Sequence, residues 1–187
     1  MARAYKKDRR RRWQASAVRS ASITVMAARW KPSVTVAAVA SRGRAGDTRG
    51  VDEYLLVEEE TAAGLRINNP AGHLEPGESL VDAVAREVLE ETASAFIADR
   101  LVGVYLARLD GDVTYLRFAF AGSVAAADPA RRLDAGIVRT LWLTLDELRA
   151  CRDRHRSVLV LRSVEDAASG CAVALDRLVT DPSVHRP

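Results

Sequence analysis

The sequence predicts a single domain of the α+β class, a mixed sandwich of strands and helices. The length of 187 residues suits one domain, because a chain of about 150 residues already buries most of the surface that its unfolded form exposes. Segments that read as strands outnumber those that read as helices, and the two kinds alternate irregularly. This irregular order favours a mixed sandwich over a doubly wound parallel sheet.

The first two strands are predicted in the N-terminal third of the chain. Residues 32–40 form a continuous apolar segment rich in β-branched side chains, which is typical of a buried strand. Residues 41–50, rich in Gly and Arg, read as a loop. Residues 54–58 (YLLVE) are predicted to form the second strand.

A helix is predicted over residues 79–92. Ser79 is a candidate N-cap, and Asp82 stands three positions later, as in a variant of the capping box. Apolar residues then recur at helical spacing on one stripe: Leu80, Val84 and Val88.

The C-terminal half is predicted to hold three more strands and two helices. Residues 101–106 and 113–121 read as strands, and in the second Tyr115 and Arg117 point to one face while Leu116, Phe118 and Phe120 point to the other. Residues 141–143 form a strand that runs into a helix opened by Thr144 and Glu147, another capping box. Residues 158–168 complete a last amphipathic helix.

Composition excludes several classes of protein. No apolar run approaches the roughly 18 residues needed to span a bilayer, so a membrane protein is excluded. Cys151 and Cys171 are too few to staple the fold, and they lack the spacing of a zinc site. A reducing, cytoplasmic setting is therefore expected.

The positive charge is concentrated at the N-terminus. Nine of the 28 basic residues but one of the 25 acidic ones lie in residues 1–30, which leaves 19 basic against 24 acidic residues elsewhere. The basic run of residues 6–12 suits nucleic acid or an acidic surface, and its continuation has the composition of a transit peptide. Because no aromatic residues are interleaved in the run and it carries no recognised motif, we interpret residues 1–29 as a disordered extension, or as sequence upstream of a start at Met26. We do not expect a nucleic-acid partner.

Candidate chemistry is concentrated in residues 72–94. On the predicted helix, Glu87, Glu90 and Glu91 stand at i, i+3 and i+4 and therefore share one face. Like charges at this spacing near a helix C-terminus repel each other and oppose the helix dipole. Arg86 supplies one positive charge, which leaves the cluster negative. A divalent cation is the natural complement, and ligands that are all oxygen favour Mg²⁺, with Mn²⁺ as the alternative.

A Glu-rich helix face is more often a solvated surface than a metal site. The residues before this helix favour the metal site. Gly72 and Gly77 bracket a tight loop in which Pro76 fixes one backbone angle, so that backbone groups can approach a metal or a phosphate closely. Glu78 adds a fourth carboxylate just before the N-cap.

At these positions the sequence resembles the Nudix hydrolase family. The Nudix box has Gly, five residues, Glu, seven residues, Arg-Glu, an aliphatic residue, any residue, Glu-Glu, any residue, Gly and an aliphatic residue. Seven positions match it: Gly72, Glu78, Arg86, Glu87, Val88, Glu90 and Glu91. Ala93 replaces the expected Gly, and Ser94 the expected aliphatic residue. If position 93 must be left-handed, Ala costs about 1 kcal/mol there.

The resemblance extends over about residues 30–176. Within the family, the sequence is similar to the NudJ-type subgroup in four segments: WKPSVTVAAV, YLLVEEE, NNPAGHLEPGESL and TYLRFAF. It implies a Nudix fold over residues 30–187, a mixed β-sheet sandwiched between α-helices, that hydrolyses a small-molecule diphosphate. By the same resemblance, Glu87, Glu90 and Glu91 hold Mg²⁺ with the Gly72 carbonyl, while Arg86 and Glu78 position helix and loop. Glu87 is the hypothesis for the general base.

Three further residues are candidates for substrate binding. His73 follows the loop glycine and is placed to touch a phosphate, although an isolated His is more often a local hydrogen-bonding residue. Tyr115 and Arg117 share a strand face on which one would stack on a base and the other pair with a phosphate. A solvated sheet face is the alternative for both.

The leading function is a Mg²⁺-dependent pyrophosphohydrolase acting on nucleoside di- or triphosphates or on thiamine-related pyrophosphates, the range that the resemblance implies. An ADP-ribose or nucleotide-sugar hydrolase is the first alternative. That subgroup typically has a Pro some fifteen residues after its box, whereas no Pro lies here between Pro76 and Pro129. A non-catalytic Nudix-fold regulator, or an RNA-associated protein using the basic arm, is the second. Such proteins tend to lose box glutamates, all of which are kept here.

Overall fold

The structure is a computed structural model that describes residues 29–48, 50–109 and 111–185. The basic run, the possible start at Met26 and nearly all of the expected N-terminal extension lie outside the described residues. Pro32 to Pro187 form one compact unit, and the description below concerns that unit.

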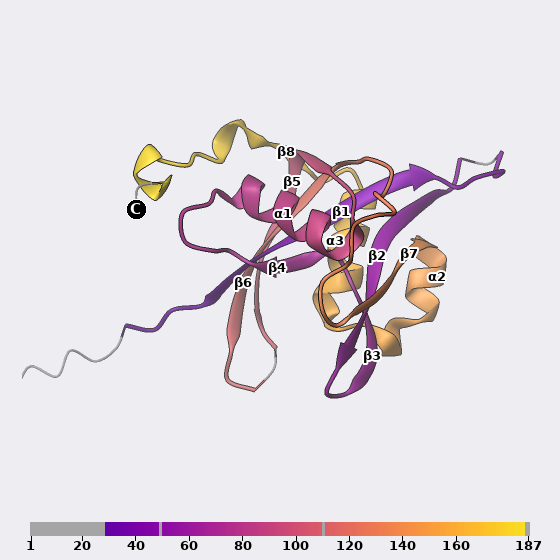
Figure 1. Ribbon diagram of the computed structural model, residues 1–187, viewed down its shortest axis with the longest axis horizontal. Coiled ribbons are helices and arrows are strands. Elements are labelled where there is room, and N and C mark those ends of the chain that lie inside the picture. The colour runs from indigo at the N-terminus through magenta and orange to yellow at the C-terminus, as the bar shows by residue number, and fades with distance from the viewer. Residues whose placement is uncertain (1–28, 49, 110, 186–187) are drawn as a thin grey trace, which may run out of the picture. The chain divides into compact units, whose positions relative to one another are not determined.

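In the described part of the chain, eight strands form one mixed sheet (Figure 1). The strands are Ser33–Gly43 (β1), Asp52–Thr61 (β2), Gly64–Asn68 (β3), Ala71–His73 (β4), Phe96–Arg108 (β5), Thr114–Val124 (β6), Ile137–Thr144 (β7) and Val173–Ala174 (β8). The main order is β3-β2-β1-β6-β5-β8, with β4 paired to β1 and β7 paired to β2. The pairing of β1 with β6 is parallel, whereas the others are antiparallel.

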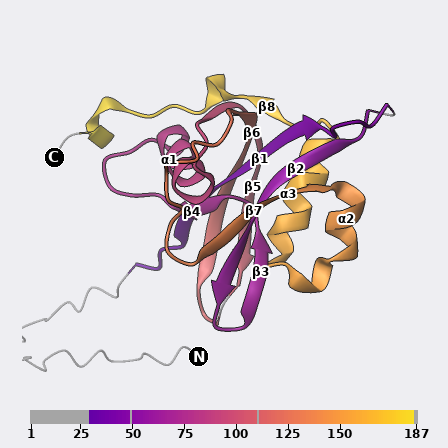
Figure 2. The same cartoon turned by 45° about the vertical axis from the view of Figure 1, so that its right-hand side comes forward.

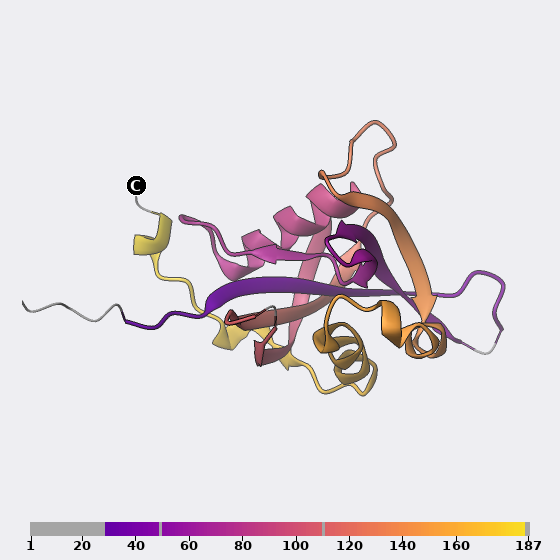
Figure 3. The ribbon, with the colours of Figure 1, turned by 90° about the horizontal axis from the view of Figure 1, so that it is seen from below.

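Helices cover both faces of the sheet (Figure 3). Leu80–Thr92 (α1) packs on one face through Ala83, Val84 and Val88, which join a buried cluster with alternate residues of β1 and with Phe120. Leu145–Ala150 (α2) and Val158–Ala168 (α3) lie together on the other face (Figure 2). Their Leu148, Val160 and Val164 are buried against β1, β2 and β3. The predicted α+β sandwich is therefore confirmed.

The register of β1 explains how one strand supports both layers. Val36, Ala38 and Ala40 belong to the cluster under α1, whereas Val39 belongs to the cluster under α2 and α3. Side chains alternate across a strand, so a continuous apolar run fits a strand buried on both faces.

Several short elements were not predicted from the sequence. The strands β3, β4 and β8 were not expected, and neither were the 3₁₀ turns Arg152–Arg154, Leu175–Arg177 and Pro182–His185. The strand expected at residues 101–106 begins earlier, at Phe96, and that at residues 54–58 begins at Asp52 and continues to Thr61. The added residues of β2 are polar and show no apolar run, whereas the added residues of β5 begin with the apolar Phe96, Ile97 and Ala98.

The C-terminal segment reaches the loop that precedes α1. His185 in the last 3₁₀ turn lies with its Nδ1 atom 2.9 Å from the carbonyl oxygen of Gly77, to which the ring N–H donates. No described helix is both long enough and apolar enough to cross a membrane.

Candidate active site

Helix α1 is fixed at both ends. At its start, Ser79 Oγ accepts a hydrogen bond from the Asp82 backbone N–H at 3.1 Å, and the predicted capping box is confirmed. At its end, Ala93 has φ 57° and ψ 21°, so the left-handed conformation anticipated at this box position is present. A non-glycine residue in this region costs roughly 1–2 kcal/mol, which the surrounding structure has to offset.

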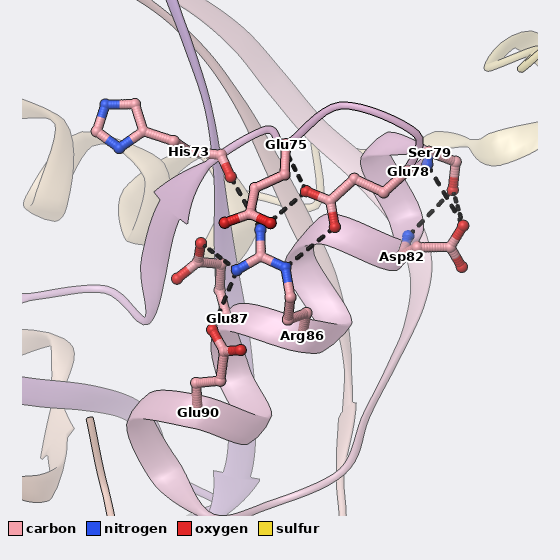
Figure 4. Close-up of polar contacts among 8 residues, drawn as sticks. All are labelled: His73, Glu75, Glu78, Ser79, Asp82, Arg86, Glu87 and Glu90. Atoms are coloured by element: carbon pink, nitrogen blue, oxygen red, sulfur yellow. Dashed lines mark hydrogen bonds and ion pairs between the residues drawn. The ribbon is translucent and has the colours of Figure 1, made fainter. Parts of the chain in front are cut away.

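Arg86 is the centre of the polar network on α1 (Figure 4). Its Nε and Nη2 atoms donate to the two carboxylate oxygens of Glu78, at 3.0 and 2.8 Å. Its Nη1 donates to Glu87 Oε1 at 2.8 Å and to Glu90 Oε2 at 3.0 Å, and its Nη2 also donates to the His73 carbonyl at 2.9 Å. A planar guanidinium thereby joins the loop before α1, the strand β4 and two carboxylates of the helix.

Gly72 in β4 lies directly against Glu87. A Cβ atom added to Gly72 would lie 2.1 Å from the Cδ and Oε1 atoms of Glu87 and 2.2 Å from Oε2. Atoms cannot approach this closely, so the carboxylate occupies the space that any side chain at position 72 would need. A side chain at position 72 would therefore have to displace the carboxylate of the first glutamate of the acidic trio.

Glu91 turns toward the same strand from one helical turn further on. Its Oε2 accepts a hydrogen bond from the Ala71 backbone N–H at 2.9 Å, and the residue is buried. Burial raises the pKa of Glu91 to about 8, and the nearby charges of Glu87, Glu59 and Asp134 act in the same direction. The site thus holds a buried acid that is costly to ionise without an added positive charge.

The carboxylates around Arg86 respond to two opposing influences. Burial raises the pKa of Glu87, although Arg86 partly opposes the rise. The hydrogen bonds from Arg86 lower the pKa of Glu78. Glu90 is the most exposed of the trio, with 30% of its side chain accessible.

The trio does not converge on one point in this structure. Arg86 bridges Glu87 and Glu90, while Glu91 bonds to the backbone of β4. No three His, Cys, Asp or Glu side chains within the described ranges gather closely enough to hold a metal ion. The donor set nevertheless fits a hard divalent cation in its chemistry, because every side-chain ligand is a carboxylate and the acidic groups outnumber the one arginine.

A pocket of about 190 Å³ opens beside Gly72 and His73, and we call it the side pocket. Strands β1, β2, β3 and β6 and the segment before α3 supply its walls, through Thr35, Glu59, Asn68, Tyr115, Arg117 and Arg156. Because β4 forms its edge, the side pocket is contiguous with the backbone that supports Glu87 and Glu91.

The three predicted substrate-binding residues all line the side pocket. The rings of His73 and Tyr115 are tilted at 45° with centroids 6.3 Å apart, and the His73 ring points away from the Arg86 guanidinium (Figure 4). Arg117 is 7% exposed, so the alternative of a solvated sheet face is wrong for this residue. Burial lowers the pKa of Arg117, while Glu59 and Glu91 oppose the change.

Sequence reasoning missed four of the pocket residues: Thr35, Glu59, Asn68 and Arg156. Glu59 and Asn68 stand in phrases that carry the family resemblance, but their roles require the pairing of β2 with β3, which places them near each other. Arg156 reaches the pocket because its backbone N–H donates to the Ile67 carbonyl at 2.8 Å, a contact without a sequence signal.

Comparisons with known proteins agree with the fold and the box. Residues 31–163 match the family model of the NUDIX domain. Phosphatase NudJ of Escherichia coli is 31% identical over 149 residues, which are 80% of this chain and 92% of that protein. A solved NUDIX hydrolase from Nitrosomonas europaea is 46% identical with a TM-score of 0.74, covering 81% of this chain and 98% of that one.

A more distant structure shares the fold alone. The NUDIX domain of Shewanella oneidensis NrtR, solved in complex with ADP ribose, is 17% identical with a TM-score of 0.59, and the match covers 75% of this chain and 89% of that one.

The fold, the acidic helix and these matches define a hydrolase of phosphoanhydride bonds. The chain belongs to the Nudix family, whose members generally use divalent metal ions and act on small-molecule diphosphates.

Proposed function

We propose that this chain is a Mg²⁺-dependent pyrophosphohydrolase that cleaves a phosphoanhydride bond of nucleoside di- or triphosphates or of thiamine-related pyrophosphates. The main observation behind the proposal is the contact of the Glu87 carboxylate with Gly72. This contact places an acidic group directly against the backbone of β4, beside the side pocket. The similarity to phosphatase NudJ supports an activity that hydrolyses a phosphate compound.

We assign the metal to Glu87, Glu90, Glu91 and the Gly72 carbonyl, with Mg²⁺ as the ion and Mn²⁺ as an alternative. When bound, the ion neutralises the charge that develops on the phosphoryl oxygens. Arg86 and Glu78 act as positioning residues in this proposal. Their bonds at 2.8 and 3.0 Å join α1 to the loop before it, and Arg86 also bonds to the His73 carbonyl.

Glu87 is our candidate for the general base that removes a proton from the attacking water. Burial raises the pKa of this carboxylate, and Arg86 partly opposes the rise. The variant E87Q is expected to lower kcat by about 10²- to 10⁴-fold, the usual contribution of a general base. A rate equal to the parent's across pH would remove Glu87 from this role.

We place the leaving group of the substrate in the side pocket, against His73, Tyr115 and Arg117. The first two present aromatic surface, and the guanidinium of the third is suited to an oxygen or a ring nitrogen. We keep the cytoplasm as the expected compartment, which the free thiols of Cys151 and Cys171 support.

The test is a hydrolysis panel of nucleoside di- and triphosphates, thiamine diphosphate and ADP-ribose, in which the phosphate monoesters, phosphate and pyrophosphate formed are measured with Mg²⁺ and with a chelator. We expect hydrolysis that requires Mg²⁺ and that is lost in the triple variant E87Q/E90Q/E91Q. Glu60→Gln serves as the matched control, because Glu60 is an exposed residue of β2 outside the proposed ligand set. Activity unaffected by the chelator would contradict the metal assignment.

A further inference from the structure

One wall of the side pocket comes from residues 154–156, a short segment between α2 and α3. Arg156 lines the pocket, and its Nε atom lies 3.7 Å from Glu59 Oε1, which is an ion pair but too long for a hydrogen bond. Glu59 also accepts a hydrogen bond from the Asn68 side chain and interacts with the charge of Arg117. Because Glu59 is shared among these partners, the position of Arg156 also depends on how its segment is held.

The backbone of residues 154–156 is attached to β3 at Ile67. The backbone N–H of Arg156 donates to the Ile67 carbonyl at 2.8 Å, and His155 forms an isolated parallel bridge with Ile67. The register of the sheet places Glu58 of β2 directly opposite Ile67. The segment and Glu58 therefore meet at the same position of the β2–β3 pairing.

Glu58 supplies a second attachment point from a buried position. It is 2% exposed, and its carboxylate forms ion pairs with Arg154 of the segment and with Arg139 of β7, the latter at 2.7 Å. The hydrogen bond from Arg139 lowers the pKa of Glu58 against the effect of burial, so the group is ionised near neutral pH. A buried carboxylate is costly to leave unpaired, which favours both contacts over solvation of the arginines.

The two arginines on Glu58 belong to different parts of the molecule. Arg154 stands two positions before Arg156, whereas Arg139 lies in β7, and neither Arg154 nor Arg139 lines the side pocket. Both side chains are exposed, 44% for Arg154 and 60% for Arg139, and both pair with the same carboxylate. One ion pair therefore bears on the pocket wall and the other does not, which gives a matched comparison within the protein.

We infer that Glu58 and Arg154 are positioning residues of the proposed hydrolase. Their ion pair holds residues 154–156 at a second point, keeps Arg156 at the wall of the side pocket and thereby sets the affinity for the leaving group of the substrate. The inference rests on the proposed function and extends it to a buried carboxylate that lines no part of the pocket. Supporting groups that hold a binding residue in place commonly decide how well a site works.

The test compares Arg154→Ala with Arg139→Ala in steady-state hydrolysis of the panel compound that is cleaved fastest. We expect Arg154→Ala to raise KM by about 10-fold, the lower end of what the loss of a supporting contact costs around bound metal ions. The kcat should stay close to the parent's value, because the glutamates of α1 are unchanged. Arg139→Ala removes an equal charge from the same carboxylate and should leave KM unchanged.

Two further measurements separate positioning from other effects. Inorganic pyrophosphate has no organic group to enter the side pocket, so its inhibition constant should be the same in the parent and in Arg154→Ala. Glu58→Gln breaks the pair from its other end and should raise KM to the same degree, and adding Arg154→Ala to it should raise KM no further. Arg154→Lys keeps the charge and should restore most of the affinity.

Thermal unfolding of each variant checks the fold. If Glu58→Gln does not fold, the arginine variants still decide the question, because both arginines are exposed side chains. A KM of Arg154→Ala equal to the parent's, or an equal rise in Arg139→Ala, would overturn the inference and leave the proposed function standing. A pyrophosphate inhibition constant that rises in step with KM would do the same, because the defect would then lie at the phosphate site. A complete absence of Mg²⁺-dependent hydrolysis across the panel would overturn the proposed function, and this inference with it.

Discussion

Gly72 is the residue on which the position of the acidic trio depends. The carboxylate of Glu87 lies where the first side-chain carbon of any other residue would stand, at 2.1 Å. The glycine therefore serves a close contact between a strand and a helix, and its value lies in the missing side chain.

We predict that Gly72→Ala lowers kcat/KM by about 10²-fold or more, because displacing a catalytic group by about 1 Å has this effect. The measurement is steady-state hydrolysis of the best substrate of the panel. Gly43→Ala is the matched control, since Gly43 also lies in a strand and an added Cβ there meets nothing within 4 Å. Equal losses in both variants would show that the contact with Glu87 is unimportant.

A second prediction concerns Glu91 in the metal-free protein. Its pKa is raised to about 8, so between its ordinary value of about 4.3 and that value the folded state binds a proton that the unfolded state releases. The free energy of unfolding should therefore fall as pH rises from 5 to 9, by an amount on the order of a few kcal/mol. Denaturant unfolding in chelator, compared with E91Q, measures it.

The E91Q variant should lose this part of the pH dependence while keeping the contributions of other groups. Glu87 also has a raised pKa, so a smaller slope of the same sign is expected to remain. Superimposable pH profiles for E91Q and the parent would contradict the assignment.

Candidate active-site residues could be predicted where their spacing along the sequence identifies a chemical function. Glu87, Glu90 and Glu91 were identified from their spacing on the predicted helix, and the positioning roles of Glu78 and Arg86 from the resemblance to the Nudix box. Glu59, Asn68 and Arg156 were not found, because they meet only through strand pairing and a loop contact. The metal and substrate roles of these residues stay proposals.

Among the elements, α1 is the one whose ends matter most for the site. Its capping box at Ser79 and Asp82 follows directly after Glu78, the carboxylate that receives two bonds from Arg86. The left-handed Ala93 ends the helix two residues after Glu91. Both ends of the helix therefore border groups that we assign to the chemistry.

We predict that Ser79→Ala lowers the free energy of unfolding by about 0.5–2 kcal/mol, the usual cost of losing an N-cap side chain. It should also lower kcat, since Glu78 is adjacent. Thr144→Ala removes the same kind of cap from α2, which carries none of the proposed ligands, and should affect stability alone. Denaturant unfolding and kinetics of both variants separate the effects; an unchanged stability of Ser79→Ala would refute the role of the cap.

The long elements were predictable because their patterns are long enough to read. Helices α1 and α3 and strands β1 and β6 follow their apolar periodicity. The strand β4 has three residues, two of them Ala and Gly, and carries no pattern. It forms because β2 pairs with β1 only at residues 41–43, which leaves residues 35–37 of β1 to pair with β4, and because Glu91 accepts a hydrogen bond from the Ala71 N–H.

In the domain as a whole, the two faces of the sheet are covered by layers of different chemical character. The face under α1 carries the acidic helix, whereas the face under α2 and α3 is an apolar layer. A buried carboxylate, Glu58 of β2, ties that second layer to the sheet through ion pairs with Arg139 of β7 and Arg154 of the 3₁₀ turn. Irregular alternation of strands and helices was enough to predict this architecture, but not the order of its strands.

The whole domain should be stabilised by its metal ion. An ion that binds only the folded state at a hundred times its Kd adds about 2.7 kcal/mol, which for a chain of this size raises Tm by about 5–10 °C. We expect this rise on adding Mg²⁺ at pH 8, measured by calorimetry, and its loss in the E90Q/E91Q variant. An equal rise in parent and variant would place the ion elsewhere.

The bond between His185 and the Gly77 oxygen bears on how the protein is best produced. Any purification tag fused behind Pro187 begins three positions past that histidine, which itself contacts the stretch that leads into α1. A charged oligohistidine tail at that point would compete for the same carbonyl and supply extra imidazoles to scavenge nickel or zinc near the glutamates. Excising such a tail before kinetic work removes both artefacts.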